Sequence, residues 1–128
     1  MKNFSEATAI KSTLQLKMVL DLKAIDICPC QIKINDQLEF YGDLVGNNTI
    51  IKHLVLDDPF KLEIIVDRQD PQAVEIVSLK IDDYEIMPLY LGHSSPPTNY
   101  IDFTGNWTFK IPNFYPWLHE ITGQGWIV

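Results

Sequence analysis

The sequence has few cysteines and no long apolar run, and each shortage excludes a class of protein. Its two cysteines, Cys28 and Cys30, flank Pro29, and no second Cys or His pair completes a zinc site. A disulfide across so short a link would be strained. We therefore expect reduced, structural thiols, with a redox or metal role as the alternative. No apolar stretch approaches the ~20 residues of a membrane-spanning helix, so we expect no membrane partner.

Basic residues are also scarce. The chain of 128 residues has 10 Lys and Arg against 17 Asp and Glu, which gives a formal net charge of −7. Affinity for nucleic acid depends on Lys and Arg that neutralise phosphates, so we expect no nucleic-acid partner. The acidity serves solubility. The first residues contain no basic-then-apolar pattern of a secretion signal, and no signal peptide is expected.

Alternation of apolar and polar residues recurs along the chain, and no long helical period appears. In the clearest example, residues 13–22, five apolar side chains share one face. Turn residues separate about seven or eight short segments of this kind, which is typical of a sandwich or barrel. We predict a jelly-roll-like antiparallel β-sandwich over residues 13–128, preceded by an arm over residues 1–12. The expected strands and hairpins cover residues 13–22, 31–41, 49–56, 61–67, 73–81, 84–90 and 100–111, with a loop at 92–99 and a short helical turn at 114–119. Within residues 100–111, Gly105-Asn106 is expected to form a turn or bulge.

Two of the predicted hairpins resemble one another. Residues 32–41 and 79–86 both read apolar-Lys-Ile, then an Asn-Asp or Asp-Asp pair, then a returning strand. Asn and Asp tolerate the left-handed backbone angles that a two-residue hairpin turn requires. Two similar hairpins suit a pseudo-symmetric sandwich, although convergent turn chemistry explains the likeness equally well.

No catalytic motif is present. His53, His93 and His119 stand in none of the patterns that mark metalloproteases, nucleophile elbows or phosphate-binding loops. We therefore predict that the protein is not an enzyme and needs no resident cofactor. Calcium is the one metal that the acidic turns could bind, with Asp82 and Asp83 as candidate ligands. The competing interpretation of these aspartates is turn formation.

Aromatic residues provide the strongest functional signal, because most of them lie between residue 100 and the last residue. An apolar segment of this kind packs into its own fold or against a partner. Trp117, Tyr115 and Trp126 are therefore candidate interface residues. A second group, Tyr84, Tyr90 and Tyr100, flanks the predicted loop, where exposed rings could stack on sugars. Core packing is the alternative for each tryptophan.

Two resemblances follow from these segments. Residues 101–112 and 114–126 (IDFTGNWTFKIP and FYPWLHEITGQGW) resemble the endings of small structural or accessory proteins of tailed bacteriophages. That resemblance implies a virion or tail component, located in the virion or the host cytoplasm. The hairpin at residues 79–86 is similar to hairpins of jelly-roll carbohydrate-binding modules, with Asp83 where those have glycine.

Two functions are therefore expected. The first is a non-enzymatic phage virion or tail accessory protein, which binds other proteins or itself through the aromatic C-terminal surface. The alternative is a carbohydrate-binding module that recognises a glycan, either with calcium bound at Asp82 and Asp83 or without it.

The first function makes a prediction about residues 123–128. Deleting them should abolish folding or assembly, because each buried aromatic side chain contributes about 1.5–3 kcal/mol. Light scattering of the full chain and of the deletion variant measures this directly. A soluble deletion variant with the mass of the intact assembly would contradict the prediction.

Overall fold

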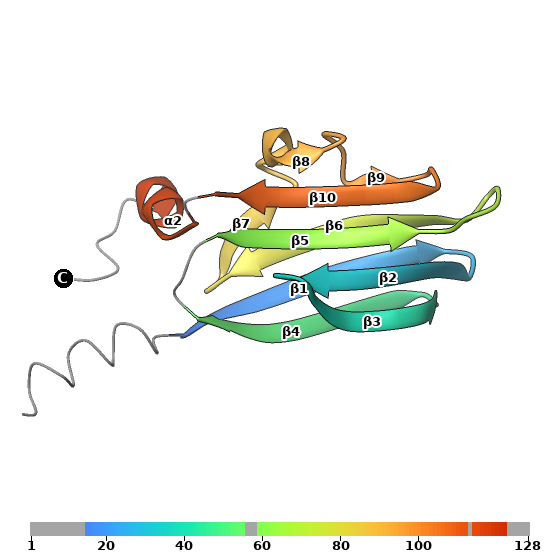
Figure 1. The fold of residues 1–128 in the computed structure, drawn as a ribbon, viewed down its shortest axis with the longest axis horizontal. Helices are drawn as coiled ribbons and strands as arrows, with labels where there is room; N and C mark the ends of the chain where they lie inside the picture. The colour runs from blue at the N-terminus through green and yellow to red at the C-terminus, as the bar shows by residue number, and fades with distance from the viewer. Residues whose placement is uncertain (1–14, 56–58, 113, 123–128) are drawn as a thin grey trace, which may run out of the picture.

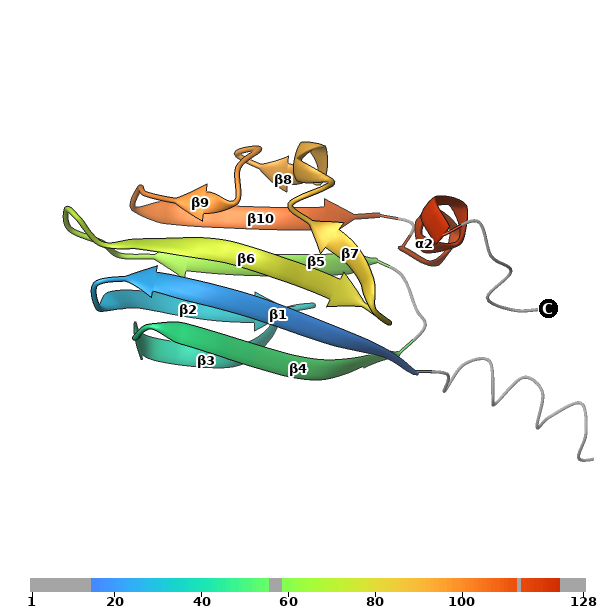
Figure 2. The same cartoon turned by 180° about the vertical axis from the view of Figure 1, so that it is seen from behind.

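The computed structural model describes residues 15–55, 59–112 and 114–122, which form two antiparallel sheets packed face to face (Figures 1 and 2). The predicted β-sandwich is confirmed. Sheet A has the strand order β4-β1-β6-β7, with β9 also paired to β6, and sheet B has the order β3-β2-β5-β10-β8. The elements are β1 (Gln15–Ile25), β2 (Cys28–Ile34), β3 (Gln37–Leu44), β4 (Asn47–Val55), β5 (Phe60–Val66), β6 (Ala73–Ile81), β7 (Tyr84–Met87), η1 (Leu91–His93), β8 (Ser94–Ser95), β9 (Tyr100–Ile101), β10 (Gly105–Ile111) and α2 (Phe114–Thr122).

The core lies between the sheets and is built from alternate residues of each strand. In β2 and β5 every second side chain is buried, as the sequence alternation predicts. The largest buried side chain is Trp107 of β10, which is 0% exposed. Its indole N–H donates to the Thr98 carbonyl at 2.6 Å, so the ring also ties the 96–99 segment to the core. For Trp107, the core-packing interpretation is correct.

The chain forms two units of similar pairing. The first unit is β1 to β4 and the second is β5 to β10. Each sheet combines the outer pair of one unit with the hairpin of the other: β4-β1 lies beside β6-β7 in sheet A, and β10-β5 lies beside β2-β3 in sheet B. The similar hairpins seen in the sequence therefore occupy equivalent places in opposite sheets (Figure 1).

Both hairpin turns dock on the neighbouring strand in the same way. Asn35 and Asp82, the first residues of the turns, have φ angles of 48° each, in the left-handed region. The Lys61 N–H donates to Asn35 Oδ1 at 2.8 Å, and the Asn35 N–H donates to the Lys61 carbonyl at 2.9 Å. At the other turn, the Lys17 N–H donates to Asp82 Oδ1 at 2.7 Å and the Asp82 N–H donates to the Lys17 carbonyl at 2.8 Å. We call this two-bond contact the turn clasp.

The structure corrects several of the predicted element boundaries. Residues 100–111 are two strands rather than one, because the chain leaves sheet A after Ile101 and enters sheet B at Gly105, whose φ is 140°. The predicted loop 92–99 contains the two-residue strand β8, and the helical turn extends to Thr122. Strand β2 begins at Cys28 and passes through Pro29, whose carbonyl accepts a hydrogen bond from the Asp67 N–H.

The turn clasp generates a stability prediction. Asp82→Ala should lower the free energy of unfolding by about 2 kcal/mol, because alanine loses both the hydrogen bond and the tolerance of left-handed angles. Asp82→Gly should lower the free energy of unfolding by a smaller amount, since glycine adopts the left-handed backbone conformation without strain. Urea unfolding measures both, with Asp102→Ala as an exposed control. An Asp82→Ala variant as stable as the control would show that the clasp contributes nothing.

Candidate binding face on sheet B

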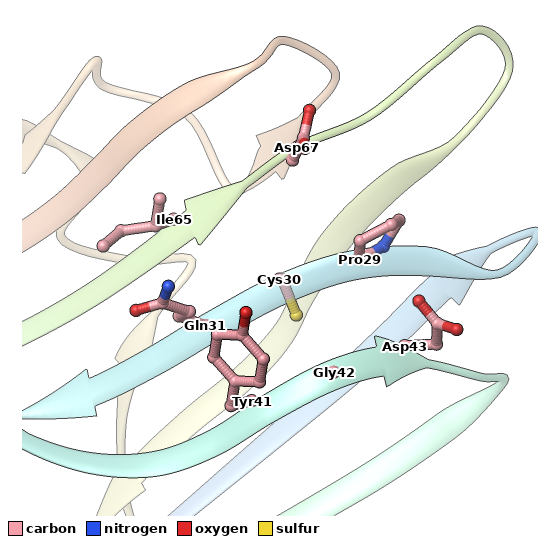
Figure 3. Close-up of a pocket in the computed structure, with 8 residues that line it drawn as sticks. All are labelled: Pro29, Cys30, Gln31, Tyr41, Gly42, Asp43, Ile65 and Asp67. Carbon is pink, nitrogen blue, oxygen red and sulfur yellow. The ribbon is translucent and has the colours of Figure 1, made fainter.

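A hollow of about 310 Å³ lies on the outer face of sheet B, where the surface crosses β3, β2 and β5 (Figure 3). Strand β3 is the edge of the sheet, so the hollow is open to water on that side. Polar and apolar groups share the lining. The residues are Pro29, Cys30, Gln31, Tyr41, Gly42, Asp43, Ile65 and Asp67.

Strand register places the outward side chains in rows across the sheet. Tyr41 of β3 lies opposite Gln31 of β2, Gln31 lies opposite Ile65 of β5, and Ile65 lies opposite Asn106 of β10. We call these four residues the cross-strand row. Each of the four has a sequence neighbour that packs on the core side, namely Phe40, Ile32, Ile64 and Trp107, so the four side chains point outward.

A second row lies beside the first, toward the ends of the same strands. Asp43 lies opposite Pro29, and the Asp67 N–H donates to the Pro29 carbonyl, so the three residues stand side by side on β3, β2 and at the end of β5. Figure 3 shows the two aspartates on either side of Pro29. Both carboxylates are exposed, and no Lys or Arg lines the hollow. The hollow therefore offers hydrogen-bond acceptors of negative charge.

Tyr41 is the most exposed large hydrophobic side chain among the described residues, at 70%. Its ring stands beside the hollow in Figure 3. Next to it in sequence, Gly42 has a φ of 139° and adds no side chain. An aromatic ring held on a strand but left in water is available to a ligand.

The two related hairpins differ in the strand that carries the hollow. Strand β3 of the first hairpin has eight residues, whereas its counterpart β7 has four and ends at Met87. The part of β3 that carries Tyr41 and Asp43 therefore has no equivalent in β7. The candidate binding face therefore uses a part of the first hairpin that the second hairpin lacks.

The two cysteine thiols belong to the core side of β2. Cys28 and Cys30 are free thiols and both are buried, as expected for structural cysteines. Burial raises the pKa of the Cys30 thiol from 9.0 to about 12, with smaller contributions from Cys28 and Asp43. Burial also raises the pKa of Cys28, and Arg68 opposes that shift. Neither thiol is poised for nucleophilic chemistry.

The tyrosines expected to form a sugar-binding platform do not lie together. Tyr84 pairs with Ile81 and Tyr100 with Glu75, so they lie six residues apart along β6, or about 20 Å. Tyr90 packs edge-on against Trp117, with ring centroids 5.2 Å apart. Tyr100 is 39% exposed and is the most accessible of the three.

The candidate interface residues fall partly outside the described structure. Trp117, on α2, is half-buried and packs against Tyr90 and also against His93, at 5.4 Å. Phe114 and Leu118, on the same helix, are buried in the core. The side chain of Tyr115 and all of Trp126 lie outside the described part. Within it, the helix packs on its own domain.

The candidate metal ligands are engaged in the second hairpin turn. Asp82 accepts the Lys17 N–H through Oδ1, and Asp83 follows it with a φ of 70°. Both therefore act in turn formation. In the described ranges, no three His, Cys, Asp or Glu side chains come together as a metal site.

The sequence reasoning did not identify Tyr41, Gln31, Asp43 or Asp67 as candidate site residues. Tyr41 was placed in a predicted hairpin, and its exposure could have been inferred from alternation with Phe40. Asp67 lies beside the hollow only because β5 pairs with β2. That pairing joins segments from the two units, and nothing in the local sequence of either strand indicates it.

Comparison with known proteins adds no relative. A scan against protein-family models, a search of curated proteins and a search of solved structures find no match for this chain. Among the residues described, no helix has the length and apolar character needed to cross a membrane.

The shifted Cys30 thiol predicts a pH dependence of stability. The unfolded thiol ionises above pH 9.0, whereas the folded thiol stays neutral to about pH 12. The buried neutral thiol therefore makes its full contribution to the free energy of unfolding below pH 9. As the pH rises above 9, this contribution falls by about 1.4 kcal/mol per pH unit. The stability difference between wild type and Cys30→Ala, measured by urea unfolding, should shrink at this rate between about pH 9 and pH 11. If wild type and Cys30→Ala lost stability equally as the pH rises, the raised pKa of the Cys30 thiol would be contradicted.

Proposed function

We propose that the protein is a non-enzymatic binding module that recognises a glycan through the outer face of sheet B. The observation that carries the proposal is the 70% exposed ring of Tyr41 beside an open hollow of about 310 Å³. Aromatic rings stack on the apolar C–H faces of sugars, while carboxylate and amide groups bind the hydroxyls around them. The hollow offers both kinds of group.

The mixture of groups favours a glycan over an apolar ligand. Apolar surface comes from Tyr41, Pro29 and Ile65, and the polar groups of Gln31, Asp43 and Asp67 alternate with it along both rows. An apolar ligand would desolvate these polar groups without replacing their hydrogen bonds to water. A polyhydroxylated ligand can replace them.

Binding without catalysis is supported by the environment of the two aspartates. Asp43 and Asp67 stand two strand spacings apart, about 10 Å, which is near the upper limit for the paired carboxylates of an inverting glycosidase. Both are exposed, however, and neither lies in the apolar pocket that a general acid needs. Release of reducing ends from a bound glycan would contradict this part of the proposal.

Assembly through the aromatic C-terminal surface has less support. In the described part of the chain, Trp117 already packs on Tyr90 and His93, and Phe114 lies in the core. These contacts leave the first turns of α2 committed to their own domain. A phage virion role would remain compatible with glycan binding, since attachment to host surfaces is a recognition task.

The proposal predicts that Tyr41→Ala weakens glycan binding. Loss of one stacked ring should weaken affinity by at least about tenfold, or about 1.4 kcal/mol. Tyr41→Phe keeps the ring and should bind almost as well as wild type. A glycan array identifies a ligand for wild type, and calorimetry then compares the variants.

Tyr100→Ala is the matched control, because Tyr100 is also an exposed strand tyrosine but lies on sheet A. It should bind like wild type. If Tyr100→Ala lost binding and Tyr41→Ala kept it, the site would lie at the loop that the sequence predicted. Melting temperatures confirm that each variant is folded.

A further inference from the structure

We infer that the hollow takes an internal segment of an extended, neutral polysaccharide, which lies across the strands of sheet B along the cross-strand row. This inference rests on the proposed glycan binding and goes beyond it. It specifies the charge of the ligand, its extended form and its direction on the sheet.

The direction follows from the cross-strand row. Tyr41, Gln31, Ile65 and Asn106 stand on four adjacent strands, and adjacent strands lie about 4.8 Å apart. That spacing is close to the length of one sugar residue in an extended chain. Successive sugars would therefore meet a stacking ring, an amide, an aliphatic side chain and a second amide.

The binding face is open at both ends of the row. Tyr41 lies on the edge strand β3, and Asn106 on β10 is exposed at the other end. Both terminal side chains stand in solvent, so a longer chain can continue past each of them. A site of this shape selects the interior of a polymer rather than its terminal sugar.

The two aspartates of the hollow disfavour anionic glycans. Asp43 and Asp67 flank the row, both are exposed, and no Lys or Arg lines the hollow. On the other side of the row, Glu63 lies opposite Lys33 and 3.9 Å from Lys61, so its charge is balanced there. Ionised carboxylates only accept hydrogen bonds, so they suit hydroxyl donors and repel uronate or sulfate groups. The net charge of −7 acts in the same direction at longer range.

The competing direction, along strands β2 and β3, would use different residues. A chain running that way from Tyr41 would next pass over Lys33 and Leu38, which pair with one another. Leu38 is 55% exposed, so it is as available as Asn106. The two directions are therefore distinguished by two single substitutions.

The experiment measures wild-type affinity for neutral cello-, manno- and xylo-oligosaccharides of increasing length. Affinity should increase up to about four sugar residues and then level off, because the row spans four strands. Asn106→Ala should weaken the longer oligosaccharides about three- to tenfold and leave the disaccharide unchanged. Leu38→Ala is the matched control and should leave all lengths unchanged.

Charge is tested in the same assay with oligogalacturonate. Wild type should not bind it, and the Asp43→Asn, Asp67→Asn double variant should bind it measurably. Asp102→Asn, which removes an exposed charge outside the hollow, should not.

The outcomes separate the inference from the proposed function. If neutral oligosaccharides bind through Tyr41 but Leu38→Ala weakens them and Asn106→Ala does not, the direction is wrong and glycan binding stands. If wild type binds oligogalacturonate as tightly as the neutral sugars, the exclusion of anionic glycans is wrong. If wild type binds no glycan, both the proposed function and this inference fail.

Discussion

Burial of alternate side chains between two sheets is the constraint on which the rest of the structure depends. Every strand of four residues or more in the described part contributes inward residues to one shared core. The same alternation obliges the intervening residues to face outward. The candidate binding face is therefore a direct product of core formation: Tyr41, Gln31 and Ile65 face outward because Phe40, Ile32 and Ile64 pack on the inside.

Much of the fold could be predicted because its signals are local. Alternation identified most strands, and the pairs Asn35-Asp36 and Asp82-Asp83 identified two hairpin turns whose positive φ angles the structure confirms. The change of sheet between β9 and β10 could not be predicted. Residues 100–111 alternate like a continuous strand, and the crossing depends on pairing with β6 on one side and β5 on the other.

The site was less predictable than the fold for the same physical reason. Its residues come from β2, β3 and β5, and the pairing of β2 with β5 joins segments from different units. Aromatic density directed attention to the residues after 100, where Trp107 and Phe114 serve the core. Tyr41 lies outside that region, in a hairpin whose sequence does not distinguish it from other strand tyrosines. Composition identifies where apolar mass is concentrated, whereas exposure depends on register.

The exchange of hairpins between the two units has a consequence for how the domain holds together. Each sheet contains the hairpin of one unit clasped to the first strand of the other, at Asn35 with Lys61 and at Asp82 with Lys17. Neither unit can therefore complete a sheet, or cover its own apolar face, without its counterpart. The domain is in effect an intramolecular dimer of two interlocked halves, which must fold together, and the binding face exists only after they have joined.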